Sequence, residues 1–171
     1  MSNGSSPAAT GIESPHCFLK IAEIKGDSRS KNHEGETEVL SWTWGQTQSV
    51  FPSQARKKGG SVSMRDVRFA AVTSAASAQF LLHCAAAKLL KTAVLTCEHD
   101  HKGGRHTYLT ITLSNVFISS YEIESSPGQD HSLDRVTLNF TKIEFTYTPL
   151  KPEGTPGSNF SSTWDLSLNT P

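Results

Sequence analysis

The chain has 171 residues, enough for one folded domain with tails, and its 16 basic residues balance its 16 acidic residues to a formal net charge of +0. This balance gives no support for binding nucleic acid or an anionic membrane through overall charge. No apolar run approaches the roughly 20 residues of a membrane-spanning helix. The start of the chain, Met1–Ser14, lacks the basic and apolar stretches of a signal peptide, so we expect the protein to fold in the cytoplasm.

The first ordered segments are predicted to be two strands joined by a polar loop. Residues Phe18–Lys25 have a strand-like composition, and Gly26 ends that run. Residues Asp27–Thr37 are charged and polar, as in an exposed loop. The next strand is predicted over Glu38–Thr47.

Apolar and polar side chains alternate along this second strand, which is typical of a strand with one buried face. The bulky residues of the alternation are Leu40, Trp42 and Trp44, and we expect them to face the core. Ser41 and Thr43 lie between them in the sequence. Because successive side chains of a strand point to opposite faces, these two are expected on the far side of the sheet.

A second polar loop and a bent strand are predicted next. The loop covers Ser49–Gly60 and carries a basic run, namely Arg56, Lys57 and Lys58. The strand covers Ser61–Val72. Its apolar positions change parity partway, which predicts a bend or bulge near Asp66.

One helix is predicted, near Ser77–Lys88, with Ser74 or Ser77 as its N-cap. Its apolar stripe follows three- and four-residue spacing and consists of Phe80, Leu81, Cys84, Ala85 and Lys88. A helix this short needs tertiary packing for stability. We therefore expect Phe80 and Cys84 to lie in the core.

Two long strand-like segments, His106–Glu124 and Leu133–Thr148, complete the pattern, with a short strand over Ala93–Glu98 before them. In each long segment the apolar positions switch parity midway, which lets one strand serve two cores or pass a barrel corner through a bulge. Leu138 and Phe140 belong to the apolar face of the last segment and are predicted core residues. Many strands with one helix predict a mainly β barrel or sandwich.

No motif in the chain predicts catalysis or cofactor binding. Four potential zinc ligands lie close together in the sequence, namely Cys97, His99, His101 and His106. The residues between them read as a polar hairpin turn, so we predict no metal site. Motifs for a nucleophile or a phosphate-binding loop are absent from the sequence. The three cysteines have no paired spacing and are expected to be buried thiols rather than a disulfide framework.

An ordered set of motifs resembles one known family. The set begins with Phe18-Leu19-Lys20-Ile21, Lys25-Gly26-Asp27-Ser28 and Leu40-Ser41-Trp42-Thr43-Trp44-Gly45. It continues with Asp66-Val67-Arg68-Phe69, Leu81–Lys88, Tyr108–Leu113 and Val136–Phe140. In this order, from about Phe18 to Pro149, the chain resembles the Hcp family (haemolysin-coregulated proteins), the tube proteins of type VI secretion systems.

The resemblance implies a two-sheet β-barrel with one α-helix packed alongside, assembling into a hexameric ring. It also implies stacked rings that carry small secreted effectors, are driven by a contractile sheath, and meet spike and baseplate proteins. Such a protein has no cofactor and leaves the cell without a signal peptide. The implied organisation is a mobile tail over 1–16, an Hcp-like domain over 17–150 and a C-terminal extension over 151–171.

Two hypotheses for functional surfaces follow from the pattern and the resemblance. Ser41 and Thr43 would line the tube lumen and contact effectors, unless their face is plain exterior. Ring stacking would join the two polar loops through opposite charges, namely Glu34 and Glu36 on one and Arg56, Lys57 and Lys58 on the other. The alternative function is a non-enzymatic β-sandwich module that binds a ligand or a protein, and such a module would be a monomer in solution.

Overall fold

The computed structural model describes residues 15–49, 61–101 and 104–170. These ranges contain one helix, α1 (Ala75–Ala85), and no helix in them is long and apolar enough to cross a membrane. The strands are β1 (His16–Ile21), β2 (Thr37–Val39), β3 (Ser41–Thr43), β4 (Gln46–Ser49), β5 (Ser61–Met64), β6 (Val67–Val72), β7 (Leu90–His101), β8 (Gly104–Glu124), β9 (Leu133–Asn139), β10 (Lys142–Tyr147) and β11 (Phe160–Asp165). The predicted mainly β class with one helix is confirmed.

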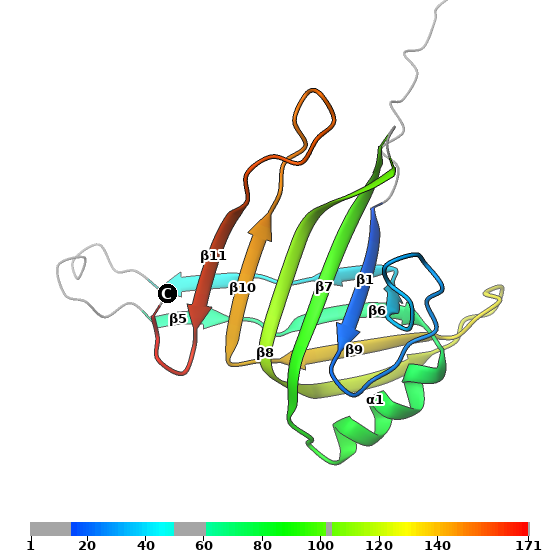
Figure 1. The fold of residues 1–171 in the computed structure, drawn as a ribbon. Coiled ribbons are helices and arrows are strands. Elements are labelled where there is room, and N and C mark those ends of the chain that lie inside the picture. Colours follow the sequence, from blue (N-terminus) through cyan, green and yellow to red (C-terminus); the bar gives the residue numbers. More distant parts are fainter. Residues whose placement is uncertain (1–14, 50–60, 102–103, 171) are drawn as a thin grey trace, which may run out of the picture.

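The strands form two antiparallel layers that share β8. The first sheet has the order β2-β1-β7-β8-β10-β11, and the second has the order β8-β9-β6-β3. Strands of the second sheet run crosswise behind those of the first (Figure 1). The hairpin β4-β5 extends beyond the two layers as a separate pair. Two sheets packed in this way enclose one apolar core between them.

Strand β8 passes from one sheet to the other at the point where the parity of its apolar residues switches. Its first part, residues 104–116, pairs with β7, and its second part, residues 117–124, pairs with β9. At Asn115 the backbone adopts a left-handed conformation, with a φ of 52°. This irregularity reverses which side chains face the core, so Ile111 is buried before it and Val116 after it.

A second crossing, at Leu40, makes one predicted core residue wrong. Leu40 is 59% exposed, although its neighbour Val39 is buried. Strand β2 pairs with β1 in the first sheet, β3 pairs with β6 in the second, and the Leu40 N–H already donates to the Ala70 carbonyl of β6. The chain therefore turns from one sheet to the other at Leu40, and the strict alternation assumed from the sequence breaks there.

The predicted closed barrel is corrected in the same region. Among the described strands, the hydrogen-bonded path begins at β2 and ends at β3, and no ladder joins these two ends. They are consecutive in the chain but belong to different sheets, because the corner at Leu40 directs their hydrogen bonds to different partners. The fold is therefore an open two-sheet arrangement rather than a closed barrel.

The other predicted core residues lie in or against the core. Phe80, Leu138 and Phe140 are buried between the layers. Trp42, Trp44 and Cys84 are half-buried and pack against the same cluster. Each large apolar side chain that is fully buried contributes about 1.5–3 kcal/mol to folding.

Helix α1 begins two residues earlier than the predicted Ser77 and buries a different stripe. Ser74 is the N-cap, and a reciprocal capping box joins it to Ser77. The buried positions of the helix are Ala76, Ser77, Phe80 and His83. Leu81, which was expected in the apolar stripe, is exposed because it lies about 100° around the helix from Phe80.

The C-terminal segment adds a strand to the first sheet. Strand β11 pairs with β10 along its whole length, from Lys142↔Asp165 to Tyr147↔Phe160. The region predicted as an extension from residue 151 therefore contains a structural edge strand. Its core-facing side is incompletely covered, since Phe145, Tyr147 and Phe160 all remain at least one-third exposed.

Candidate functional site

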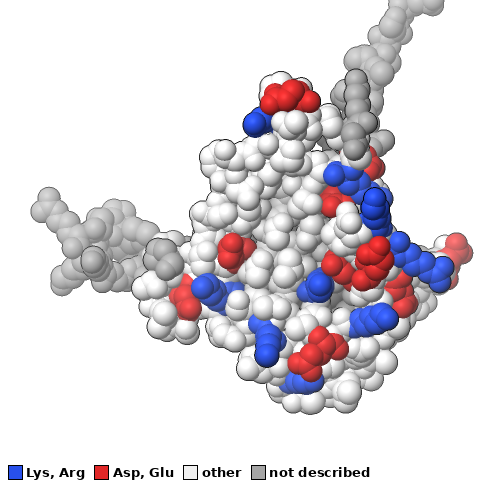
Figure 2. Space-filling view, viewed as in Figure 1, with Lys and Arg blue, Asp and Glu red and all other residues white. Residues whose placement is uncertain are grey.

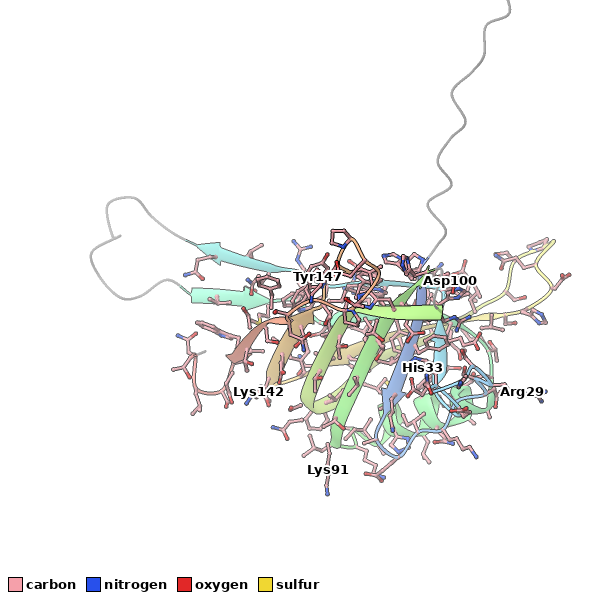
Figure 3. The ribbon with its side chains drawn as sticks, turned by 45° about the horizontal axis from the view of Figure 1, so that its top comes forward. Arg29, His33, Lys91, Asp100, Lys142 and Tyr147 are labelled. Atoms are coloured by element: carbon pink, nitrogen blue, oxygen red, sulfur yellow. The ribbon has the colours of Figure 1, made fainter. Side chains whose placement is uncertain are left out.

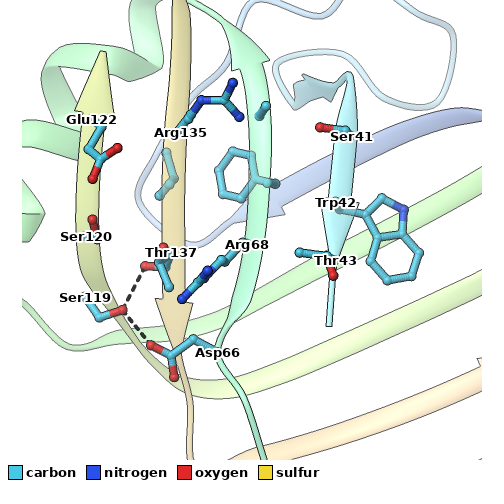
Figure 4. A pocket seen from close by; sticks show the side chains of 13 residues that line it. Ser41, Trp42, Thr43, Asp66, Arg68, Ser119, Ser120, Glu122, Arg135 and Thr137 are labelled. Atoms are coloured by element: carbon cyan, nitrogen blue, oxygen red, sulfur yellow. Dashed lines mark hydrogen bonds between the residues drawn. The ribbon is translucent and has the colours of Figure 1, made fainter. Parts of the chain in front are cut away.

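The outer face of the second sheet carries two rows of side chains, and we call it the sheet-two face (Figure 4). The first row follows the strand register across β3, β6, β9 and β8 through Ser41, Ala70, Arg135 and Glu122. The second row follows the same strands through Thr43, Arg68, Thr137 and Ser120. Side chains at alternate positions of these strands point to the core, so the rows share the opposite face.

Ser41 and Thr43 occupy the face that the sequence predicted for them. Both are exposed, whereas Trp42 between them packs against the core. Their hydroxyl groups lie at the edge of a hollow of about 780 Å³ on the sheet-two face. The geometry brings them together with charged residues from the other three strands, which the sequence did not identify as site residues. Their contact with an effector stays a prediction.

A small hydrogen-bonded group closes one end of the hollow. Ser119 lies at an irregularity in the pairing of β8 with β9, and its hydroxyl donates to Asp66 at 2.8 Å (Figure 4). The Asn139 amide donates to the other carboxylate oxygen of Asp66 at 2.9 Å. A bulged residue is often turned to a new direction in this way. The bend predicted near Asp66 thus places a carboxylate on the sheet-two face.

Both signs of charge are available in the hollow. Arg135 forms an ion pair with Glu124 at its rim. Within the described ranges, Arg68 and Glu122 lie in the hollow without an ion-pair partner. A surface with hydroxyl groups, a free guanidinium and a free carboxylate offers donors and acceptors of both kinds. Such a surface can form polar contacts with many different protein surfaces.

A buried carboxylate beneath this face fixes the second sheet to the helix. Asp134 of β9 is 0% exposed and accepts hydrogen bonds from three hydroxyl groups. The donors are Ser77 at 2.5 Å, Tyr121 at 3.1 Å and Thr73 at 3.3 Å. Burial, and secondarily the Asp134 charge, raise the pKa of Tyr121, so this phenol stays a donor. This group has no signal in the sequence, because its members come from three separate segments: the start of α1, β8 and β9.

The loop over residues 27–37, which carries Glu34 and Glu36 and which we call the acidic loop, contains a buried histidine. His33 stacks on Phe18 with ring centroids 4.1 Å apart and lies against β1 (Figure 3). Its Nδ1 is 2.8 Å from a Glu36 carboxylate oxygen, and its Nε2 is 3.2 Å from one of Glu98. Burial opposes protonation of His33, but these two carboxylates outweigh it and raise its pKa.

The residues proposed for ring stacking have different surroundings. Glu34 is exposed, whereas Glu36 is half-buried and directs its carboxylate to His33 inside the chain. The basic residues of that hypothesis, Arg56, Lys57 and Lys58, lie outside the described residues. Glu34 is therefore an exposed carboxylate of the acidic loop, which also exposes the basic residues Arg29 and Lys31.

The four potential zinc ligands do not form one group, although His99 and His106 are direct partners across β7 and β8. Cys97 is buried in the core, His99 stacks on Tyr108, and the Nε2 atom of His106 is 2.9 Å from the Thr148 carbonyl. Over residues 15–49, 61–101 and 104–170, no group of three histidine, cysteine or acidic side chains is placed to hold a metal ion. The strands β7 and β8 continue to His101 and Gly104, so most of the predicted hairpin loop is strand.

Comparisons with known proteins all lead to one family. The family model described as "Type VI secretion system effector, Hcp" matches residues 18–147. Protein hcp1 of Pseudomonas aeruginosa is 32% identical over 154 residues, which cover 89% of this chain and 95% of that protein. Among solved structures, a type VI secretion system effector from Yersinia pestis has a TM-score of 0.70 at 26% identity and covers 87% of this chain and 98% of its own. Hcp1 from Salmonella typhimurium has a TM-score of 0.75 at 23% identity, with 92% and 99% covered, and shows a similar fold.

Proposed function

This chain belongs to the Hcp family of type VI secretion effectors, and from that premise we propose that it is a non-enzymatic subunit of the secretion tube. In this proposal six copies close into a ring, and rings stack into the tube. Effectors of small size travel inside, and the tube contacts the sheath, spike and baseplate proteins of the same machine. The protein is then secreted with its cargo.

The observation that carries the proposal is the polar, hollowed sheet-two face. A lumen that conveys different proteins needs a surface with hydrogen-bonding groups of several kinds. The sheet-two face supplies the short side chains of Ser41, Thr43, Thr137 and Ser120, with Arg68 and Glu122 among them. Figure 2 shows few charged side chains at the centre of the outer face of the first sheet, where the register places hydroxyl side chains such as Thr110 and Thr112. The mixed charges and the hollow distinguish the sheet-two face. We therefore assign the sheet-two face to the lumen.

Uncovered apolar side chains support self-assembly. Phe145, Tyr147 and Phe160 lie on the core side of the first sheet, in register with the buried residues Ile111 and Leu109. The second sheet does not cover them, and Phe160 is 66% exposed. We call these three residues the β10-β11 strip. Because the strip continues the core itself and ends at an edge strand, we propose that a second copy of the chain covers it.

Stacking of rings is proposed to use the acidic loop. Exposed Glu34 offers a negative charge on this loop, and the basic run of Arg56, Lys57 and Lys58 would meet it in the next ring. Exposed pairs of this kind contribute about 0–1 kcal/mol each. Salt should therefore separate stacked rings before it separates the subunits of one ring.

Two measurements on the full chain test the function. Size-exclusion chromatography with light scattering should give a mass six times the 18.6 kDa of one chain, with rings visible by negative-stain microscopy. Co-purification with a small effector of the same secretion system then compares wild type with Thr43→Arg. Thr43→Ser is the matched control, because it keeps the hydroxyl group and adds no bulk.

The lumen assignment predicts that Thr43→Arg keeps the ring but loses the effector, while Thr43→Ser keeps both. If Thr43→Arg retains the effector, the sheet-two face is exterior. If it dissolves the ring, that face is a subunit interface. A strictly monomeric wild-type protein at micromolar concentration would instead support the alternative of a single binding module.

A further inference from the structure

Two cysteines far apart in the sequence lie opposite each other in the first sheet. Cys17 of β1 and Cys97 of β7 are direct partners in the antiparallel register. Cys17 is 7% exposed and Cys97 is 0% exposed, and both are free thiols. Their neighbours on the same face, Leu19 and Leu95, are also buried, so the two thiols point into the core between the layers.

The hydrogen bonds of β1 define which kind of pair the cysteines form. The Ala22 N–H donates to the Thr92 carbonyl at 2.9 Å, and these residues continue the register of the β1-β7 ladder. Hydrogen-bonded and non-hydrogen-bonded pairs alternate along an antiparallel ladder. Counting back from Ala22 makes Cys17 and Cys97 a non-hydrogen-bonded pair. The Cα atoms of such pairs are about 4.5 Å apart, which lies within the range of about 4.4–6.8 Å that a disulfide spans.

We infer that Cys17 and Cys97 are a redox modification site that forms a reversible disulfide within one chain, with hydrogen peroxide or a small disulfide as the oxidant. The strands are already paired at this point, so the bond forms without a rearrangement of the backbone. It would tie the first ordered strand, which β2 covers along only three residues, to the centre of the first sheet. If the proposed export also holds, the chain leaves a reducing compartment as a dithiol and becomes cross-linked outside.

The chemistry balances with peroxide as the only co-reactant. A hydrogen bond from Cys97 is the main cause of a lowered pKa at Cys17, against the effect of burial, while the same contact raises the pKa of Cys97. Cys17 is also the more exposed of the two, so in our inference it is the thiol that gives up its proton and attacks peroxide, giving a sulfenic acid and hydroxide. Cys97 then displaces that oxygen and forms the S–S bond. In sum, two thiols lose two electrons and two protons, and one peroxide becomes two waters.

The third cysteine provides an internal control. Cys84 lies on α1, half-buried, and has no cysteine opposite it within the described residues. It should stay a thiol under mild oxidation that converts the other two. Comparing Cys84 with the other two cysteines distinguishes oxidation that depends on two facing thiols from general oxidation of the protein's thiols.

The test counts thiols in the full-length protein. Reduced protein is treated with a small excess of hydrogen peroxide, unfolded, and alkylated with N-ethylmaleimide, and its intact mass is measured. Reduced protein should take up three maleimides, one for each cysteine, whereas oxidised protein should take up one. Peptide mapping without reductant should give a linked pair containing Cys17 and Cys97, and dithiothreitol should restore all the thiols.

Variants and thermal melting add an independent measurement. Cys84→Ser should lose its two remaining thiols on oxidation and should melt at a higher temperature when oxidised. Cys97→Ala should show no such shift, and Cys17→Ala serves equally if that variant folds poorly. Three maleimides after oxidation, a linked peptide containing Cys84, or a disulfide between two chains would each overturn the inference. None of these results bears on ring formation or effector binding, which are measured separately.

Discussion

The replacement of Asp134 by alanine should destabilise the fold strongly, although no ligand surface is touched. Its carboxylate is the shared acceptor for Ser77, Tyr121 and Thr73, and it lies under the sheet-two face. The Ser77 hydroxyl also accepts from the Ser74 N–H, so it completes the helix cap as well. Removal of Asp134 therefore loosens the helix and the second sheet together.

The magnitude follows from the burial of each donor. A hydrogen bond to a charged group contributes about 1.5–3 kcal/mol, and a buried donor left without a partner costs about 1–3 kcal/mol. Ser77 is buried and loses its acceptor outright, whereas exposed Thr73 and half-buried Tyr121 can turn to water. We expect Asp134→Ala to lower the free energy of unfolding by about 2–4 kcal/mol. Asp134→Asn keeps one acceptor oxygen and should cost about 1 kcal/mol.

Urea unfolding followed by tryptophan fluorescence measures these differences. Assembly adds stability by mass action, so variants are compared in the same assembly state, established by light scattering. Asp66→Ala is the matched control, since Asp66 also accepts two side-chain hydrogen bonds but from the exposed residues Ser119 and Asn139. If Asp134→Ala costs less than about 1 kcal/mol, or no more than Asp66→Ala, the donors are satisfied elsewhere and this reasoning fails.

Three further predictions concern the acidic loop and the β10-β11 strip. A Cβ at Gly26 would lie 2.3 Å from the Glu36 carbonyl oxygen, so Gly26→Ala should cost about 1–3 kcal/mol in urea unfolding, whereas Gly45→Ala, with nothing within 4 Å, should cost much less. Because the pKa of His33 is raised in the fold, its contribution to stability is complete below its ordinary value of 6.5 and is lost as pH rises through the raised pKa. The stability difference between wild type and His33→Gln should thus shrink as pH increases above that value, and a constant difference would refute the ionic role. Phe160→Asp should convert rings to folded monomers in light scattering, because each buried phenylalanine contributes about 1.5–3 kcal/mol, while Ser161→Asp on the opposite face should leave rings intact.

The sequence alone was sufficient for the elements whose signal is local. Period-two patterns located most of the strand regions, although the segments predicted over Glu38–Thr47 and Leu133–Thr148 are divided into several strands. The parity switch between Ile111 and Val116 marks the point where β8 leaves one sheet for the other. The same alternation correctly placed Ser41 and Thr43 on the face away from the core. The ordered motifs were specific enough to indicate the family. These features depend on neighbours in the chain, which the sequence contains directly.

The errors lie where the chain changes partners. Alternation along Leu40, Trp42 and Trp44 predicted one continuous buried face, but the strand leaves the first sheet for the second at Leu40. Side-chain periodicity defines a face only while the backbone keeps the same pairing, so a corner without glycine or proline gives no local signal. The prediction that Leu81 belongs to the buried stripe of the helix was wrong for a related reason. The spacing of apolar residues indicates a stripe, but it does not show which residues at its margin contact the sheets.

Only the tertiary structure brought distant residues together. The opposition of Cys17 and Cys97 depends on the register between β1 and β7, and the environment of Asp134 depends on three segments meeting at one point. Composition and spacing contain neither fact, because pairing between strands far apart in the chain is selected by the packing of the whole core. The sequence therefore determined the elements and the family, whereas the packing determined the hollow on the sheet-two face, the buried His33 and the facing thiols.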